Sequence, residues 1–338
     1  GNLRWKAPED PEIWNNVFDA TTPGNVGIQL SGSDIIGSED CLNLDIYRPN
    51  TDETNLPVLL FIHGGNNQTG TSSEIDARKL AVNANCIVVS INYRLGALGF
   101  NSLPALKTGD INEDSGNYTL LDIAKSLDWI NENIEAFGGN PNNITASGFS
   151  AGGRDIMAML ISPIFEGKFQ KAIAFSGGMT ISDPEESAQI IAKAIAPLVI
   201  EDNVKETEED AYNWLLTDDT EVKDYLYSLF LTDTVTGFGA SYPEAFNNEG
   251  AKDLSNKFTK YISNFLWNDN PNGEDLVEWN SWTSSSDGPT QLLLDADLNK
   301  AIITMSHERT SYESILNEIE NDHSITDEDK NTIVKEVL

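Results

Sequence analysis

The stretch GFSAGG, from Gly148 to Gly153, constrains the fold more than any other part of the sequence. It follows the strand-like residues NITAS and precedes a helical run, so a serine stands where a strand turns sharply into a helix. Small residues two before and two after Ser150, here Gly148 and Gly152, permit that turn and leave the hydroxyl exposed at the carboxyl edge of a sheet. The pattern predicts a nucleophilic serine at residue 150.

A second glycine turn ends an earlier strand. Residues 58–65 read VLLFIHGG, an apolar run that closes with Gly64 and Gly65. Glycine gives the backbone the freedom to aim N–H groups at a single point. The N–H of Ala151, at the start of the helix after the serine, points at the same place, where a negatively charged oxygen would form.

Short strands and helices alternate through the first half of the chain. Strand-like runs cover residues 42–47, 58–65, 86–93 and 171–178. Residues 121–137 place apolar side chains at helical spacing, and GGNP then stops the helix. Two of the strands are almost wholly apolar, as in a sheet covered on both faces. This order predicts an α/β fold with a mostly parallel, doubly wound sheet.

The second half of the chain has a different composition. It is strongly acidic and reads as helical at about 180–236, at 251–266 and in a charged tail from 300 to 338. We find no internal repeat or low-complexity linker. We therefore expect one domain over residues 1–338 with a helical C-terminal part.

Charge and composition exclude several kinds of partner. The chain has 54 acidic and 21 basic residues, and its formal charge of −33 repels nucleic acid and anionic membranes. No apolar run is long enough to span a membrane, and no signal peptide is visible, so both a cytoplasmic and a secreted location stay open. No cluster with metal-ligand spacing and no dinucleotide fingerprint occurs, so we expect neither a metal nor an organic cofactor. The oligomeric state is not fixed by the sequence.

Several runs together resemble type-B carboxylesterases, the cholinesterase-like branch of the α/β-hydrolase fold. The similarity covers most of the chain in order. The matching runs are LRWKAP (3–8), EDCLNLDIYRP (39–49), FIHGG (61–65), INYRLGALGF (91–100), GNYTLLDIAKSLDWINENIEAFGGNPNNITASGFSAGG (116–153) and FQKAIAFSGG (169–178).

The resemblance implies a serine carboxylesterase acting through an acyl-enzyme on Ser150. We expect its small-molecule substrate to be an uncharged or cationic carboxylic ester. It assigns the oxyanion donors to the backbone N–H groups of Gly65, Asn66 and Ala151, with Asn66 standing where the family usually has a third glycine. It also implies two internal ion pairs, which are Arg4 with Glu39 and Arg94 with Asp122.

The chain departs from the family pattern near the serine and at a cysteine. Phe149 stands where the family usually has a glutamate. Gly27 stands where the family has a cysteine, so Cys41 loses its expected disulfide partner, and Cys86, in an apolar strand, reads as a small buried hydrophobe.

The base of the expected triad is missing from its usual position. The order in this fold is serine, then acid, then histidine, but the best-matching segment offers Phe238 or, with a gap shift, Tyr242 where the histidine should be. His63 belongs to the glycine turn, His307 reads as a histidine on a surface helix or a relocated base, and His323 lies in an acidic turn. No carboxylate stands out as the orienting acid.

Three explanations of this departure stay open. The chain is a trimmed form of an ordinary esterase, or a natural short relative that serves as a binding or adhesion module, or an enzyme with a rebuilt triad. Intact serine and oxyanion turns favour the first and third, because a pure binding module has no physical need for them.

Overall fold

The computed structural model describes residues 3–32, 34–178, 181–229 and 249–281, and after these residues 288–289, 291–296, 299–307, 316, 319, 321 and 330. The chain divides into two compact units, which are Gly1–Tyr242 with Leu266–Asp269, and Pro243–Phe265 with Asn270–Leu338. A single domain spanning residues 1–338 stays a prediction.

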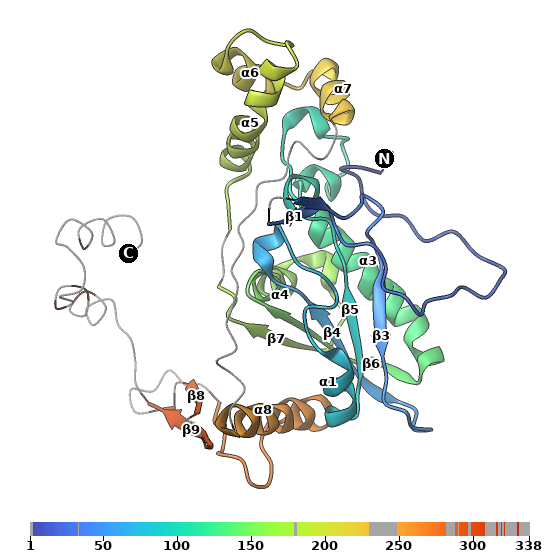
Figure 1. Ribbon diagram of the computed structural model, residues 1–338, viewed down its shortest axis with the longest axis vertical. Helices are drawn as coiled ribbons and strands as arrows, with labels where there is room; N and C mark the ends of the chain where they lie inside the picture. The colour runs from blue at the N-terminus through green and yellow to red at the C-terminus, as the bar shows by residue number, and fades with distance from the viewer. Residues whose placement is uncertain are drawn as a thin grey trace. The chain divides into compact units, whose positions relative to one another are not determined.

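Within the described residues, a five-stranded sheet forms the centre of the first unit (Figure 1). Its strands are β3 (Leu44–Tyr47), β4 (Leu56–Ile62), β5 (Ile87–Ile91), β6 (Gly139–Phe149) and β7 (Lys171–Phe175). The spatial order is β3-β5-β4-β6-β7, in which β5, β4, β6 and β7 run parallel and β3 pairs antiparallel with β5 at one edge. The predicted mostly parallel α/β sheet is confirmed.

Helices cover both faces of this sheet. Every residue of β4 and β5 is buried, which explains their continuous apolar sequence. Alternate β4 residues, among them Leu60 and Ile62, pack in one cluster with α3 (Tyr118–Asn133) and α4 (Ala151–Ile161). The helix α1 (Ala77–Ala84) contacts β5 but contributes no residue to that cluster, as expected for a helix on the opposite face.

The other elements of the first unit are short, apart from three helices that follow the sheet. The hairpin of β1 (Gln29–Ser31) and β2 (Asp34–Ile36), helix α2 (Gly96–Gly99), helices α5 (Pro184–Glu201), α6 (Glu208–Leu215) and α7 (Thr220–Ser228), and 3-10 turns at Gly65–Asn67, Pro104–Leu106, Glu113–Ser115, Ile134–Phe137 and Pro163–Phe165 complete it. Buried residues of α5, α6 and α7 form a second apolar cluster with Trp5 and Leu98. Across the described residues, none of the helices is both long enough and apolar enough to cross a membrane.

The second unit contains a hairpin that the sequence analysis did not predict. After α8 (Glu249–Asn268), whose last residues belong to the first unit, β8 (Gln291–Ala296) pairs antiparallel with β9 (Ala301–Ser306). The expected helix from residue 300 onward is therefore wrong at its start, because the β-branched run Ile302–Thr304 favours a strand. His307 directly follows β9, so its prediction as a helical residue is also wrong.

Both predicted ion pairs are present and hold the first unit together. The buried Arg94 donates from Nε to Asp122 Oδ2 at 2.8 Å and from Nη2 to Asp122 Oδ1 at 2.5 Å. Arg4 donates to Glu39 in the same forked way, at 2.9 and 2.8 Å, and its Nη1 also reaches the carbonyl of Leu229 just beyond α7 at 3.2 Å. The Arg4 guanidinium lowers the pKa of Glu39 to about 2.

The two cysteines are buried and unpaired. Burial raises the pKa of both Cys41 and Cys86 to about 12, so neither forms a thiolate at neutral pH. Cys86 confirms its prediction as a small buried hydrophobe.

The buried ion pair gives a direct stability prediction. Asp122→Asn leaves the Arg94 guanidinium buried without a countercharge, so we expect the free energy of unfolding to fall by about 3 kcal/mol. The matched control is Asp10→Asn, which breaks the exposed ion pair with Lys125 and should cost less than about 1 kcal/mol. Urea unfolding at pH 7 measures both, and equal losses in the two variants would contradict the role given to the Arg94–Asp122 pair.

Candidate active site

Ser150 occupies a strained turn between β6 and α4. Its backbone dihedrals are φ 54° and ψ −113°, outside the regions that a serine normally adopts. The turn is fixed on both sides, because the Ser150 N–H donates to the Phe175 carbonyl at 2.8 Å and the Ser150 carbonyl accepts from the Arg154 N–H at 3.0 Å. Backbone strain that the surroundings hold in place is typical of functional sites.

The glycines on either side of Ser150 allow three backbone segments to pack closely, which are the ends of β4 and β6 and the start of α4. A Cβ on Gly148 would lie 2.2 Å from the Gly152 carbonyl oxygen, and a Cβ on Gly152 would lie 2.2 Å from the carbonyl oxygen of Ile62, at the end of β4. No side chain fits at either position. The start of α4 is therefore pressed against the end of β4, which is where the second glycine turn begins.

The turn after β4, residues Gly64–Asn67, lies against Ser150 and is called the oxyanion turn below. A Cβ on Gly64 would lie 3.2 Å from the Ser150 Cβ. Gly65, Asn66 and Asn67 all have positive φ, at 81°, 57° and 56°, which glycine and asparagine tolerate best. The Gly64 N–H donates to Glu74 Oε2 at 3.1 Å.

Three backbone N–H groups at this place have no acceptor among the described residues. They are those of Gly65, Asn66 and Ala151, the three donors that the resemblance implies. Ala151 is the first residue of α4, so its N–H is one of the groups that a helix start leaves unpaired. The arrangement presents donors and the positive end of a helix beside a serine hydroxyl.

Two side chains of α4, the helix that begins directly after Ser150, bind the oxyanion turn. Arg154 Nη2 donates to Asn66 Oδ1 at 2.6 Å, and Asn67 Nδ2 donates to Asp155 Oδ1 at 3.0 Å. Sequence reasoning missed both α4 residues. The signal available was a charged pair, Arg154–Asp155, inside an otherwise small and apolar helical run.

His63 supports the oxyanion turn and is not placed to act as a base. Its side chain is 1% exposed and stacks on Tyr93 with ring centroids 4.2 Å apart. Its Nδ1 lies 3.1 Å from the Gly64 carbonyl oxygen, which only accepts, so Nδ1 carries the proton. Burial lowers the pKa of His63 to about 4, so the ring is neutral at pH 7.

The structure does not bring the remaining candidates for the triad into this arrangement within the residues it describes. His307 is exposed and belongs to the second unit. Phe238, Tyr242 and His323 lie outside the described residues. Phe149, at the end of β6, is 44% exposed and places an aromatic ring next to Ser150 in the chain.

An uncharged cavity of about 280 Å³ adjoins the oxyanion turn. Asn66, Asn67 and Gln68 line one wall, and four residues of α5 line another. The other lining residues come from Ile28 and from residues 95–98 and 100, and none of the lining side chains carries a charge. A small, uncharged pocket of this kind suits the apolar part of an organic ligand.

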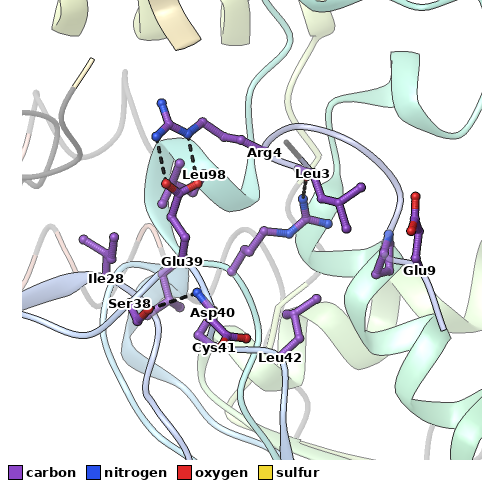
Figure 2. Close-up of a pocket in the computed structure, with 13 residues that line it drawn as sticks. Leu3, Arg4, Glu9, Ile28, Ser38, Glu39, Asp40, Cys41, Leu42 and Leu98 are labelled. Carbon is purple, nitrogen blue, oxygen red and sulfur yellow. Dashed lines mark hydrogen bonds and ion pairs between the residues drawn. The ribbon is translucent and has the colours of Figure 1, made fainter. Parts of the chain in front are cut away.

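A second cavity, of about 370 Å³, has a different character (Figure 2). Its walls hold the carboxylates of Glu9 and Asp40 as well as Arg4, Glu39 and Arg94. The last three are already paired, as the dashed lines between Arg4 and Glu39 show for one pair. Neither Ser150 nor the oxyanion turn lines it. Ser150 lines neither cavity, but Asn66 and Asn67 of the oxyanion turn line the smaller one, so we associate the candidate site with that cavity. Among the described side chains, no group of three or more His, Cys, Asp or Glu residues is arranged to hold a metal ion.

Comparison with known proteins identifies relatives for the part of the chain that carries this site. The family model described as "Carboxylesterase family" matches residues 1–222. The para-nitrobenzyl esterase of Bacillus subtilis (strain 168) is 43% identical over 212 residues, which are 59% of this chain and 42% of that protein. The acylcarnitine hydrolase of Rattus norvegicus is 40% identical over 215 residues, or 59% of this chain and 37% of that protein.

The solved structures that resemble this chain are esterases as well. A PNB esterase structure superposes with a TM-score of 0.54 at 40% identity, covering 67% of this chain and 47% of the other. A thermophilic PNB esterase gives a TM-score of 0.55 at 36% identity, covering 71% and 51%. The chain thus spans half or less of the length of the curated relatives it matches.

The close backbone approach at the serine turn predicts that Gly152 cannot be replaced without a loss of stability. Gly152→Ala places a methyl group into the Ile62 carbonyl oxygen, so we expect a loss of at least about 3 kcal/mol in the free energy of unfolding. The control Gly178→Ala adds a methyl group where no atom lies within 4 Å and should change stability little. Thermal unfolding of the two variants compares them, and a fully stable Gly152→Ala protein would contradict the packing described.

The buried ring of His63 gives a second prediction. Because its pKa is lowered to about 4, the imidazole should stay neutral, with the proton on Nδ1, from pH 5 to pH 9. Nitrogen-15 NMR of the histidine side chains measures both the charge and the tautomer. A His63 signal that titrates near the ordinary value of about 6.5 is the result that would refute this assignment.

Proposed function

This chain belongs to the carboxylesterase family, and on that premise we propose that it hydrolyses carboxylic esters through an acyl-enzyme formed on Ser150. The observation that carries the proposal is the juxtaposition of the strained Ser150 turn with the oxyanion turn, whose Gly64 approaches the serine Cβ.

In the proposed reaction, Ser150 Oγ attacks the ester carbonyl carbon and loses its proton to a base. The N–H groups of Gly65, Asn66 and Ala151 stabilise the oxygen that becomes negatively charged. The alcohol then leaves with a proton, and water attacks the acyl-enzyme to release the acid and restore the serine. Removing one such donor in a serine hydrolase lowers kcat by about 10²–10³-fold, so donor geometry is central to the rate.

The proposal assigns no general base. His63 is neutral, is buried and uses Nδ1 in a hydrogen bond to Gly64, so we exclude it from that role. His307 stands in the second unit, and His323 lies outside the described residues. The turns that hold the nucleophile and the oxyanion donors support a residual rate of ester hydrolysis by themselves, because part of the catalysis remains when a triad is incomplete.

The cavity beside the oxyanion turn favours an uncharged substrate group. Its walls carry no charge and are apolar on the side of α5, and together with its small volume they suit a short aliphatic or aromatic part of an ester. A cationic group would be buried there without a countercharge, which is costly. We therefore propose small neutral esters as the substrate class, in spite of the strongly negative charge of the chain.

Labelling with a fluorophosphonate tests the assignment of Ser150. Such probes form a stable bond only with an activated serine, so we expect one adduct in the intact mass of the protein. Ser150→Ala should abolish both the adduct and the turnover of p-nitrophenyl butyrate. The control Ser73→Ala, at an exposed serine, should leave both unchanged.

Two outcomes of this experiment count against the proposal. An adduct that survives in Ser150→Ala places the reactive serine elsewhere. No adduct in the unmodified protein, with no ester turnover, favours the alternative that the fold serves as a binding module.

A further inference from the structure

Asp155 is the least expected side chain next to the oxyanion turn. It is 5% exposed, and its Oδ2 has no hydrogen-bond partner among the described residues. Burying a carboxylate with an unpaired oxygen is costly, and proteins rarely retain such a group without a use. Its Oδ1 makes one contact, the 3.0 Å hydrogen bond from Asn67 Nδ2.

We propose that Asp155 is a positioning residue whose carboxylate, through Asn67, holds the oxyanion turn so that its N–H donors face Ser150. This inference rests on the proposed function, because the proposed reaction is what requires the N–H donors to face Ser150. Asp155 touches neither the serine nor the oxyanion in this proposal and acts only through the turn.

The turn needs an external restraint of this kind. Asn66 and Asn67 both have left-handed φ values, and few hydrogen bonds inside the turn hold them. The Gly65 carbonyl oxygen accepts hydrogen bonds from the N–H groups of Gln68 and Thr69. These bonds fix the end of the oxyanion turn but not its N–H donors. Residues 66 and 67 are each held by one side chain of α4, and α4 begins directly after Ser150. The N–H donors of the oxyanion turn and the hydroxyl of Ser150 are thereby both positioned by α4.

The charge of Asp155 decides the strength of this restraint. A hydrogen bond to an ionised carboxylate is roughly twice as strong as one to a neutral carboxyl group. Burial raises the pKa of Asp155 to about 6, while the hydrogen bond from Asn67 and the nearby Arg154 guanidinium act in the opposite direction. Tyr93, Glu74 and the neutral His63 are the other titratable groups close to this network. The restraint is therefore strong above about pH 6 and weakens below it.

The same shift gives the dependence of stability on pH. An unfolded aspartate ionises at about 3.9 and the folded one at about 6. The folded state thus binds more protons between these values, and stability falls as the pH rises through that window. At neutral pH the ionised Asp155 destabilises the fold.

The test uses Asp155→Asn, which keeps the shape and removes the charge, with Glu166→Gln at an exposed site as the matched control. The first readout is the pH dependence of the backbone amide NMR signals of Gly65 and Asn66, which requires no turnover. The second is the melting temperature at pH 5 and pH 8. The third is kcat/KM for p-nitrophenyl butyrate. Asn67→Ala, which removes the link on the turn side, is a second variant.

We expect the Gly65 and Asn66 signals to titrate near pH 6 in the unmodified protein and in Glu166→Gln. The titration should vanish in Asp155→Asn and in Asn67→Ala. Asp155→Asn should also melt at a higher temperature at pH 8, with about half of that gain at pH 5, which lies midway through the window. It should lose about tenfold in kcat/KM, less than the loss of a whole oxyanion donor.

Signals that do not titrate in the unmodified protein overturn the inference, as does an Asp155→Asn protein that melts lower at both pH values. If no ester is turned over although the signals titrate as expected, the proposed function fails while the positioning role stands.

Discussion

The contact between Gly152 and the Ile62 carbonyl oxygen is the constraint on which the rest of the site depends. It sets the distance between the start of α4 and the end of β4, because no side chain can separate them. Ser150, at the start of α4, and Gly64, two residues after Ile62, are neighbours for that reason. Parallel strands bring their carboxyl ends to one edge of the sheet. The close packing of α4 against β4 then places Ser150 and Gly64 next to each other at that edge.

The strong negative charge of the chain does not extend into the cavity beside the oxyanion turn. The net charge of −33 contrasts with a cavity whose lining side chains are uncharged and with a neutral, buried His63. Backbone dipoles act strongly where water and competing charges are excluded. The charges that are buried in the first unit either form ion pairs, as Arg94 and Asp122 do, or contact the oxyanion turn, as Asp155 does.

Much of this structure could be predicted from the sequence. The strands β4 and β5, the helix α3 and the ion pair Arg94–Asp122 follow from apolar runs, helical spacing and a family resemblance, all of which are local in the sequence. The hairpin of β8 and β9 was missed, because the acidic composition around it suggested helix while the branched residues from Ile302 favoured a strand. Asp155 was missed for a different reason. Its hydrogen-bond partner is Asn67, which is 88 residues away in the chain, and no local pattern shows that contact.

The structure of the protein with a small aryl boronic acid tests the central claim most directly. Boron would bond to Ser150 Oγ and mimic the tetrahedral species formed during ester hydrolysis. A preformed oxyanion hole predicts one boronate oxygen within about 3 Å of the N–H groups of Gly65, Asn66 and Ala151, with the aryl group in the cavity beside α5. Boron bound at another residue, or a boronate oxygen directed away from these donors, would contradict that prediction.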